Sequence, residues 1–98
     1  DQSEPARDFV KRYEEKYGKT PGSEAAYHYL ALNVLVEAMD LADTTDPTEI
    51  RANMNAAFDQ MDPMKNTYSV IEVDEGGGFV VYPTMAVVED GKVVEKEF

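Results

Sequence analysis

The chain has 98 residues, which is enough for one domain with a modest core. Its 20 acidic and 9 basic residues give a net charge of −11, so nucleic-acid phosphates and anionic membrane surfaces would repel it. The absence of cysteine excludes disulfides, thiolate zinc sites and cysteine nucleophiles. The sequence shows no signal peptide and no apolar run that could span a bilayer.

An apolar stripe at helical spacing predicts a first helix over about residues 4–17. Ser3 suits the N-cap and Pro5 the first turn, while Gly18 and then Pro21 end the helix. The side chains of the stripe, which we expect to be buried, are Ala6, Phe9, Val10, Tyr13 and Tyr17.

The second predicted helix, residues 23–42 with Ser23 as its N-cap, is apolar almost all the way round. Its polar side is a single line formed by Asn33, Glu37 and Asp40. A surface helix needs only one apolar stripe, so this helix is expected to pack on two or three sides. Three helices and a small sheet should not cover all of Leu30, Val34 and Leu41.

The segment that begins "TTDPTEI" predicts a third helix over about residues 47–58. Asp46 is the expected cap, Pro47 occupies the first helical position, and Glu49 completes a capping-box pattern. Pro63 follows as a stop. The predicted buried stripe consists of Ile50, Met54, Ala57, Phe58 and Met61.

The pattern becomes strand-like from Tyr68, and strands are predicted over about 68–74, 79–88 and 92–97. In the first strand, Ser69, Ile71 and Val73 should share a face, and Pro83 marks an edge or bulge in the second. "EGGG" is a turn and "EDGK" a strong hairpin signal. The predicted fold is α/β as part of a larger lobe, or α+β as an isolated fragment: three helices followed by a small antiparallel hairpin sheet, in a single domain of residues 1–98.

The sequence offers little for catalysis. His28 is the single histidine and lies in no catalytic motif, so we expect a surface or capping residue. Glu37 and Asp40 could hold a hard cation, but a solvated stripe is the favoured interpretation. The "DEGGG" segment lacks the ligands of a calcium or phosphate loop. We therefore predict no enzyme, no catalytic residue, no metal and no cofactor.

Two tyrosines in the first turns of the second helix, Tyr27 and Tyr29, mark the place where a small-molecule contact is plausible. Backbone N–H groups point outward there, and tyrosine lines ligand clefts. Core packing is the alternative for each of them.

The helical part of the chain resembles the C-terminal segment of type I periplasmic solute-binding proteins, the branched-chain-amino-acid (Leu/Ile/Val) receptors of ABC importers. The family shows an F-x-x-x-Y-x-x-x-Y-G-x-x-P helix and turn, then a Tyr-Asp-Ala-led apolar helix and a short helix led by Asp-Pro. It closes with a hairpin like that at Asp90 and Gly91. The family's G-x-x-G-x-x-x-F-D strand has no good counterpart in "DPMKNTYSVIEVDEGGG". The matching residues in the helical part are Phe9, Tyr13, Tyr17, Gly18, Pro21, Tyr29, Ala31, Leu35, Glu37, Ala38, Asp46, Pro47, Ile50 and Met54, with Leu30 in place of the usual Asp.

The resemblance implies a fragment of a longer two-lobe receptor, periplasmic or extracellular, that binds an amino acid or a similar small organic solute. Its partners would be that solute and an ABC permease. In the family the start of the second helix lies near the cleft, which makes Ala26, Tyr27 and Tyr29 the expected ligand contacts. The helix would pack on a sheet from upstream sequence, so the isolated chain should associate with itself. A ligand-sensing domain of a signalling receptor and a small stand-alone interaction module remain alternatives.

Overall fold

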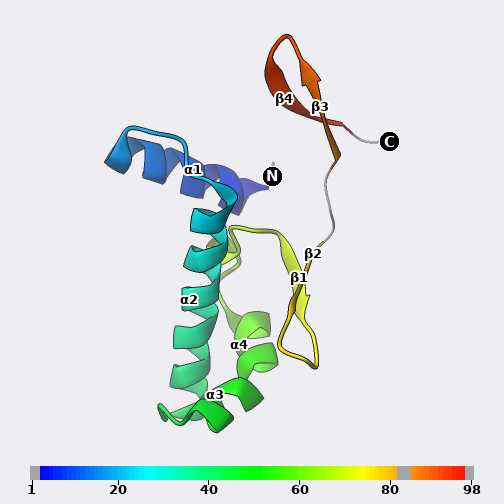
Figure 1. Ribbon diagram of the computed structural model, residues 1–98. Coiled ribbons are helices and arrows are strands. Elements are labelled where there is room, and N and C mark those ends of the chain that lie inside the picture. Colours follow the sequence, from blue (N-terminus) through cyan, green and yellow to red (C-terminus); the bar gives the residue numbers. More distant parts are fainter. Residues whose placement is uncertain (1–2, 82–84, 97–98) are drawn as a thin grey trace.

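The computed structural model describes residues 3–81 and 85–96, which form a mixed α+β fold (Figure 1). The β-strands form two separate two-stranded antiparallel sheets, β1–β2 and β3–β4. The elements in chain order are α1 (Glu4–Tyr17), α2 (Ser23–Ala42), α3 (Pro47–Ala52), α4 (Met54–Gln60), the 3-10 turn η1 (Pro63–Lys65), β1 (Val70–Val73), β2 (Phe79–Val81), β3 (Met85–Glu89) and β4 (Lys92–Lys96).

The predicted ends of α1 are confirmed. The Ser3 hydroxyl accepts a hydrogen bond from the Ala6 N–H at 3.3 Å, which satisfies one of the free N–H groups of the first turn. Gly18 takes a left-handed conformation with φ 72° and donates its N–H to Glu14 O at 2.8 Å. The N-cap of α2 is Gly22, one residue before the predicted Ser23, which is the first helical residue.

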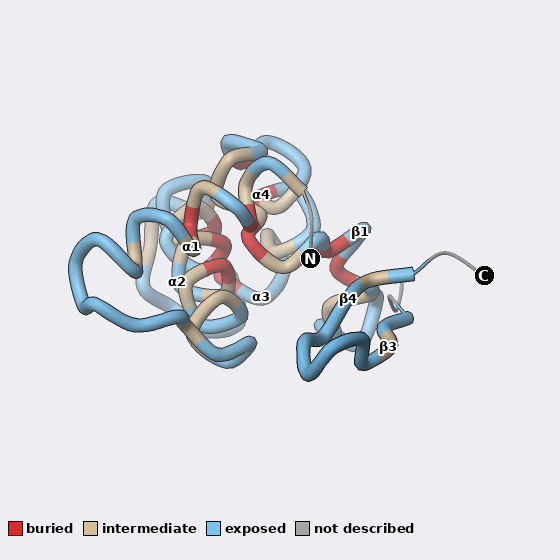
Figure 2. Tube along the Cα trace, turned by 90° about the horizontal axis from the view of Figure 1, so that it is seen from above, coloured by how far each residue is buried: buried red, intermediate tan, exposed pale blue. Residues whose placement is uncertain are grey.

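The core of the molecule is formed by one face of α2, together with α4 and the β1–β2 hairpin. Leu30 and Val34 are fully buried and pack with Met61 and Val70. Further along α2, Ala38 is fully buried in a second cluster with Ile50 and Ala57. Figure 2 shows the buried residues gathered in the helices and β1. Leu30 and Val34 are therefore covered by α4 and β1, whereas Leu41 is 39% exposed, so the expectation that not all three would be covered is confirmed.

The third predicted helix is divided into α3 and α4 at Asn53. This residue has φ −103° and ψ 3°, outside the helical region, and its side chain donates to Glu49 O at 2.8 Å. The predicted cap is confirmed, since the Asp46 carboxylate accepts from the Thr48 N–H at 3.3 Å. Ile50 and Ala57 of the predicted stripe are buried. The break lets α4 fold back along α2 (Figure 1).

A short polar loop attaches β1 to the first turns of α2. Thr67 is buried, and its hydroxyl donates to Ala26 O at 2.7 Å across 41 residues of sequence. The Asn66 side chain accepts from the Val70 N–H at 3.0 Å and donates to Val70 O at 2.9 Å, as a paired backbone would. Ser69 adopts a positive φ of 52° inside this loop. The loop thereby fixes where the β1–β2 hairpin starts.

The predicted face of the first strand is wrong. The buried side chains of β1 are Val70 and Val73, while Ile71 is exposed. The pairing with β2 shifts between Val70 and Glu72, and such a bulge interrupts the alternation of side chains between the two faces. An apolar pattern of period two cannot reveal a bulge in advance.

The β3–β4 hairpin closes at Asp90 and Gly91, as predicted, and both residues have positive φ. It lies away from the helices (Figure 1), and none of its described residues is buried. The long strand predicted over 79–88 is described as β2 and β3. Pro83, the predicted edge or bulge, lies outside the described residues.

The prediction that Tyr17 is buried is wrong, because 56% of its surface is exposed. It is the last residue of α1, and that end of the helix extends beyond α2 (Figure 1). Its ring lies 4.7 Å from the Tyr13 ring, and the Lys16 amino group lies 5.6 Å from the ring centroid, both within α1.

The contribution of each face of α2 to stability can be compared by making the same valine-to-alanine substitution on both faces. Val34→Ala should lower the free energy of unfolding by about 2–3 kcal/mol, because it removes two buried methyl groups and leaves a cavity. Val36→Ala, on the exposed face, should change it by less than about 0.5 kcal/mol. Urea unfolding followed by circular dichroism measures both. Equal losses would show that both faces are packed in solution.

Candidate functional site

The three ligand contacts expected at the start of α2 point in different directions. The Tyr29 ring faces α1, where it lies 5.1 Å from the Phe9 ring, and the Arg12 guanidinium carbon lies 5.8 Å from its centroid. The Tyr27 ring faces the β1–β2 hairpin. The Ala26 carbonyl oxygen accepts the hydrogen bond from the Thr67 hydroxyl. The structure therefore does not gather these three residues into one site.

Tyr29 joins α1 to α2. A side-chain hydrogen bond with Tyr29, and then one with Asp8, raises the pKa of Arg12 above its ordinary value. The bond between Arg12 Nε and the Asp8 carboxylate is 2.9 Å long and exposed, so it contributes little stability by itself. Tyr29 is half-buried, and its ring contacts both Phe9 and Arg12. We therefore interpret Tyr29 as a packing residue.

Tyr27 is the exposed member of an aromatic cluster. Its ring makes an edge-on contact with Tyr68 at 5.4 Å and a tilted one with Phe79 at 5.5 Å, with 40% of the residue exposed. Ala26 precedes Tyr27 in the chain, and Thr67 precedes Tyr68. The hydrogen bond from Thr67 to Ala26 O therefore holds the Tyr27 and Tyr68 rings close to each other. The exposed part of Tyr27 is therefore a surface that a ligand could contact, at the junction of α2 and the β1–β2 hairpin.

Two of the three residues in the polar line of α2 make hydrogen bonds within the protein. Asn33 donates to Tyr29 O at 2.8 Å, and Glu37 accepts from the Gln60 side chain of α4 at 3.0 Å. His28 shares a hydrogen bond with Glu24 O at 2.7 Å. Within residues 3–81 and 85–96, no three histidine or acidic side chains are grouped to hold a metal ion. None of the helices described there could cross a membrane.

The outer face of α2 is apolar and uncovered. We define it by Leu32, Leu35 and Val36, which are 61%, 39% and 45% exposed. By helical spacing, Leu32 and Val36 point away from the buried Leu30 and Val34, and Leu35 lies beside them. Leu41, at the C-terminal end of the helix, is also partly exposed, as expected from the sequence. We treat these neighbouring apolar side chains as a candidate surface for contact with another element or another protein.

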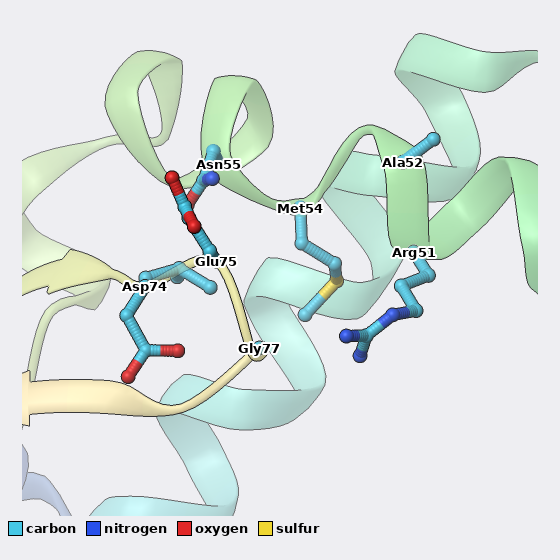
Figure 3. Close-up of a pocket in the computed structure, with 8 residues that line it drawn as sticks. Arg51, Ala52, Met54, Asn55, Asp74, Glu75 and Gly77 are labelled. Atoms are coloured by element: carbon cyan, nitrogen blue, oxygen red, sulfur yellow. The ribbon is translucent and has the colours of Figure 1, made fainter.

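A cavity of about 250 Å³ lies between the junction of α3 and α4 and the turn of the β1–β2 hairpin. Figure 3 shows the Met54 side chain between two charged sides, with Arg51 on one and Asp74 and Glu75 on the other. The lining residues are Arg51, Ala52, Met54, Asn55, Val73, Asp74, Glu75 and Gly77.

The turn at one side of the cavity is fixed by hydrogen bonds to Asp74. The Asp74 carboxylate accepts a hydrogen bond from the Gly78 N–H at 2.7 Å, and the backbone N–H of Asp74 donates to Gly78 O at 2.8 Å. Arg51 Nη2 donates to Gly76 O at 3.1 Å. Gly77 has φ 86°, and a Cβ there would lie 2.7 Å from Arg51 Nη1. The glycines thus serve the turn, as the sequence predicts, and one of them also makes room for Arg51.

This cavity was missed by the sequence analysis. Arg51 belongs to an exposed charged face of α3, which carries no pattern of its own, and 25 residues separate it from Gly76. The "DEGGG" segment was the one available signal, and it was correctly interpreted as a turn. Only the folding of α3 against the hairpin brings a cation and two carboxylates to one cavity.

Comparisons of the chain with models of protein families, with curated proteins and with solved structures give no match. The function is therefore argued from the residues and their arrangement.

The turn beside the cavity can be tested with two adjacent glycines. Gly77→Ala should lower the free energy of unfolding by about 1–2 kcal/mol, because an L-residue is strained at this positive φ and its Cβ meets Arg51. Gly76→Ala, whose Cβ would lie 3.4 Å from Asp74 Oδ1, should change it by less than about 0.5 kcal/mol. Urea denaturation compares the two. A neutral Gly77→Ala would mean that the turn adopts another conformation in solution.

Proposed function

We propose that this chain is part of an extracytoplasmic solute-binding receptor of an ABC importer, for an amino acid or a similar small organic solute. The outer face of α2 is the observation that carries the proposal. A helix with a core-forming face and a second apolar face fits a position between two layers of a larger lobe. The order of the helices and the closing β3–β4 hairpin are similar to the C-terminal segment of such receptors, as the sequence resemblance implies, although the β1–β2 segment has no good counterpart there.

The size of the outer face favours a covering layer from the same polypeptide. Three half-exposed side chains present on the order of 200 Å² of apolar surface, whereas a stable interface between separate chains needs about 800 Å² per partner. A layer in the same polypeptide avoids the entropy cost of bringing two free molecules together. The isolated chain should self-associate only weakly, with help from the exposed Val88 and Val93 of the β3–β4 hairpin.

The proposed mechanism is closure of two lobes around the solute, followed by docking on a membrane permease. The start of α2 would face the cleft, and Tyr27 is its exposed aromatic side chain. The Tyr27 ring, held against Tyr68 and Phe79, would form part of a wall against which the solute packs. Ala26 and Tyr29 support this wall through their contacts with Thr67 and α1. The same arrangement would serve a sensor that reports the solute to a signalling partner.

A stand-alone, self-associating interaction module is the second candidate. The same outer face favours it, together with Val88 and Val93 of the β3–β4 hairpin, of which 73% and 77% are exposed. In that case the apolar surfaces would be covered by a second copy of the chain.

The first test is the mass of the endogenous protein, measured by immunoblot of source-cell extract with an antibody against this segment. A band several times heavier than 11.0 kDa is expected. Calorimetry on that longer protein should then give micromolar binding of an amino acid, whereas the 98-residue chain should not bind at micromolar concentrations. A band near 11 kDa, or micromolar binding by the short chain, would overturn the proposal.

The outer face is tested by Leu32→Glu. In the 98-residue chain it should leave the free energy of unfolding within about 0.5 kcal/mol and reduce weak self-association, because the side chain is exposed. In the longer protein it should prevent stable folding, because the covered charge would have no partner. Arg7→Gln makes the same change in net charge on α1 and should do neither. Light scattering and thermal unfolding measure both effects, and a stable longer Leu32→Glu protein would refute a covering layer.

A further inference from the structure

Met54 joins the two core clusters of the molecule. Its side chain packs against the cluster of Leu30 and Val34 and also against the cluster of Ala38 and Ile50. Of the described, partly buried apolar side chains that pack on these clusters, it is the one that touches both. It is also the first residue of α4, directly after the break between α3 and α4. A chemical change at its sulfur atom would therefore affect how the short elements pack on α2.

The same side chain can be reached by small molecules from solvent. Met54 lines the cavity of about 250 Å³, and most of the other lining residues are exposed, so the cavity opens to water. Figure 3 shows the Met54 side chain with its sulfur atom between Arg51 and Asp74. A space of this volume holds several water molecules at roughly 30 Å³ each. Hydrogen peroxide, which is only slightly larger than water, can therefore enter it.

Other methionines have only one of these two properties. Met85 is 58% exposed, but it belongs to the β3–β4 hairpin, in which no described residue is buried. Met61 is part of the Leu30 cluster but is only 5% exposed. Of the five methionines in the chain, Met54 alone lines the cavity. Oxidation at Met85 should therefore be fast and without effect on the fold, and oxidation at Met61 should be slow.

We propose that Met54 is a site of reversible oxidation by hydrogen peroxide, and that its oxidation loosens the β1–β2 hairpin from the helices. The thioether sulfur attacks one peroxide oxygen, so that an S–O bond forms while the O–O bond breaks. The sulfur is oxidised by two electrons, and the second oxygen leaves with both protons as water. The product, methionine sulfoxide, is polar. A polar group that replaces an apolar one among Leu30, Val34 and Ile50 weakens their packing.

The turn end of the hairpin should loosen first. Val73 of β1 lines the same cavity as Met54, and the turn is held on α3 by the exposed 3.1 Å bond from Arg51 to Gly76 O. The other end is held by the buried Thr67, whose hydroxyl bond to the helix is 2.7 Å long. This inference does not depend on the proposed role in solute binding.

The test is treatment of the folded, ¹⁵N-labelled chain with hydrogen peroxide. Peptide mass spectrometry should find one added oxygen at Met85 and at Met54 before any at Met61. The melting temperature should fall by about 5–10 °C when Met54 is oxidised. The amide signals of Val73 and Gly77 should shift more than that of Thr67. A thiol-dependent sulfoxide reductase, which oxidises two thiols to a disulfide and releases the oxygen as water, should restore the melting temperature.

Three variants assign the effect to one sulfur atom. Met54→Leu keeps an apolar side chain of similar volume, so it should fold and lose most of the peroxide effect. Met85→Leu is the matched control and should keep the full effect. Met54→Gln introduces a polar side chain of similar length and should lower the melting temperature without any oxidant.

Four results would overturn the proposal. The first is an unmodified Met54 in a folded chain whose Met85 is fully oxidised. The second is an unchanged melting temperature after oxidation of Met54. The third is an equal peroxide effect in Met54→Leu and the unsubstituted chain, and the fourth is a Met54→Gln chain as stable as the unsubstituted one.

Discussion

The burial of one face of α2 by α4 and β1 is the packing on which the rest of the structure depends. Leu30 and Val34 lose all contact with solvent there, in a cluster with Met61 and Val70. A seven-residue helix and a two-stranded sheet are not stable alone in water. Their positions therefore depend on α2, the longest of the described helices.

Two polar attachments orient the β1–β2 hairpin on this core, one at each end. The bond from Thr67 to Ala26 O fixes the start of the hairpin at the first turns of α2, and the bond from Arg51 to Gly76 O fixes its turn at α3. The first attachment holds the Tyr27–Tyr68 ring pair, and the second forms the charged cavity. The Tyr27 surface and the cavity thus both arise where the same hairpin meets the helices.

The sequence predicted the helices well because their signals are local. The caps at Ser3 and Asp46 and the left-handed Gly18 appear where the residue types indicate. The break at Asn53 and the bulge between Val70 and Glu72 were missed, because neither changes the composition of its segment. The burial of individual tyrosines was harder to predict. Tyr13 and Tyr17 belong to the same apolar stripe of α1, yet the exposure of Tyr17 depends on where α1 ends relative to α2.

The element types, the turns and the apolar character of α2 can be inferred from local sequence, since they follow from neighbouring side chains and backbone preferences. The sequence also indicated that α2 has more apolar surface than a small domain covers. The tertiary structure alone decided which face of α2 is covered and that Leu32, Leu35 and Val36 form the uncovered one. The bond from Arg51 to Gly76 O is also decided at that level, because contacts between residues so far apart depend on how whole elements pack.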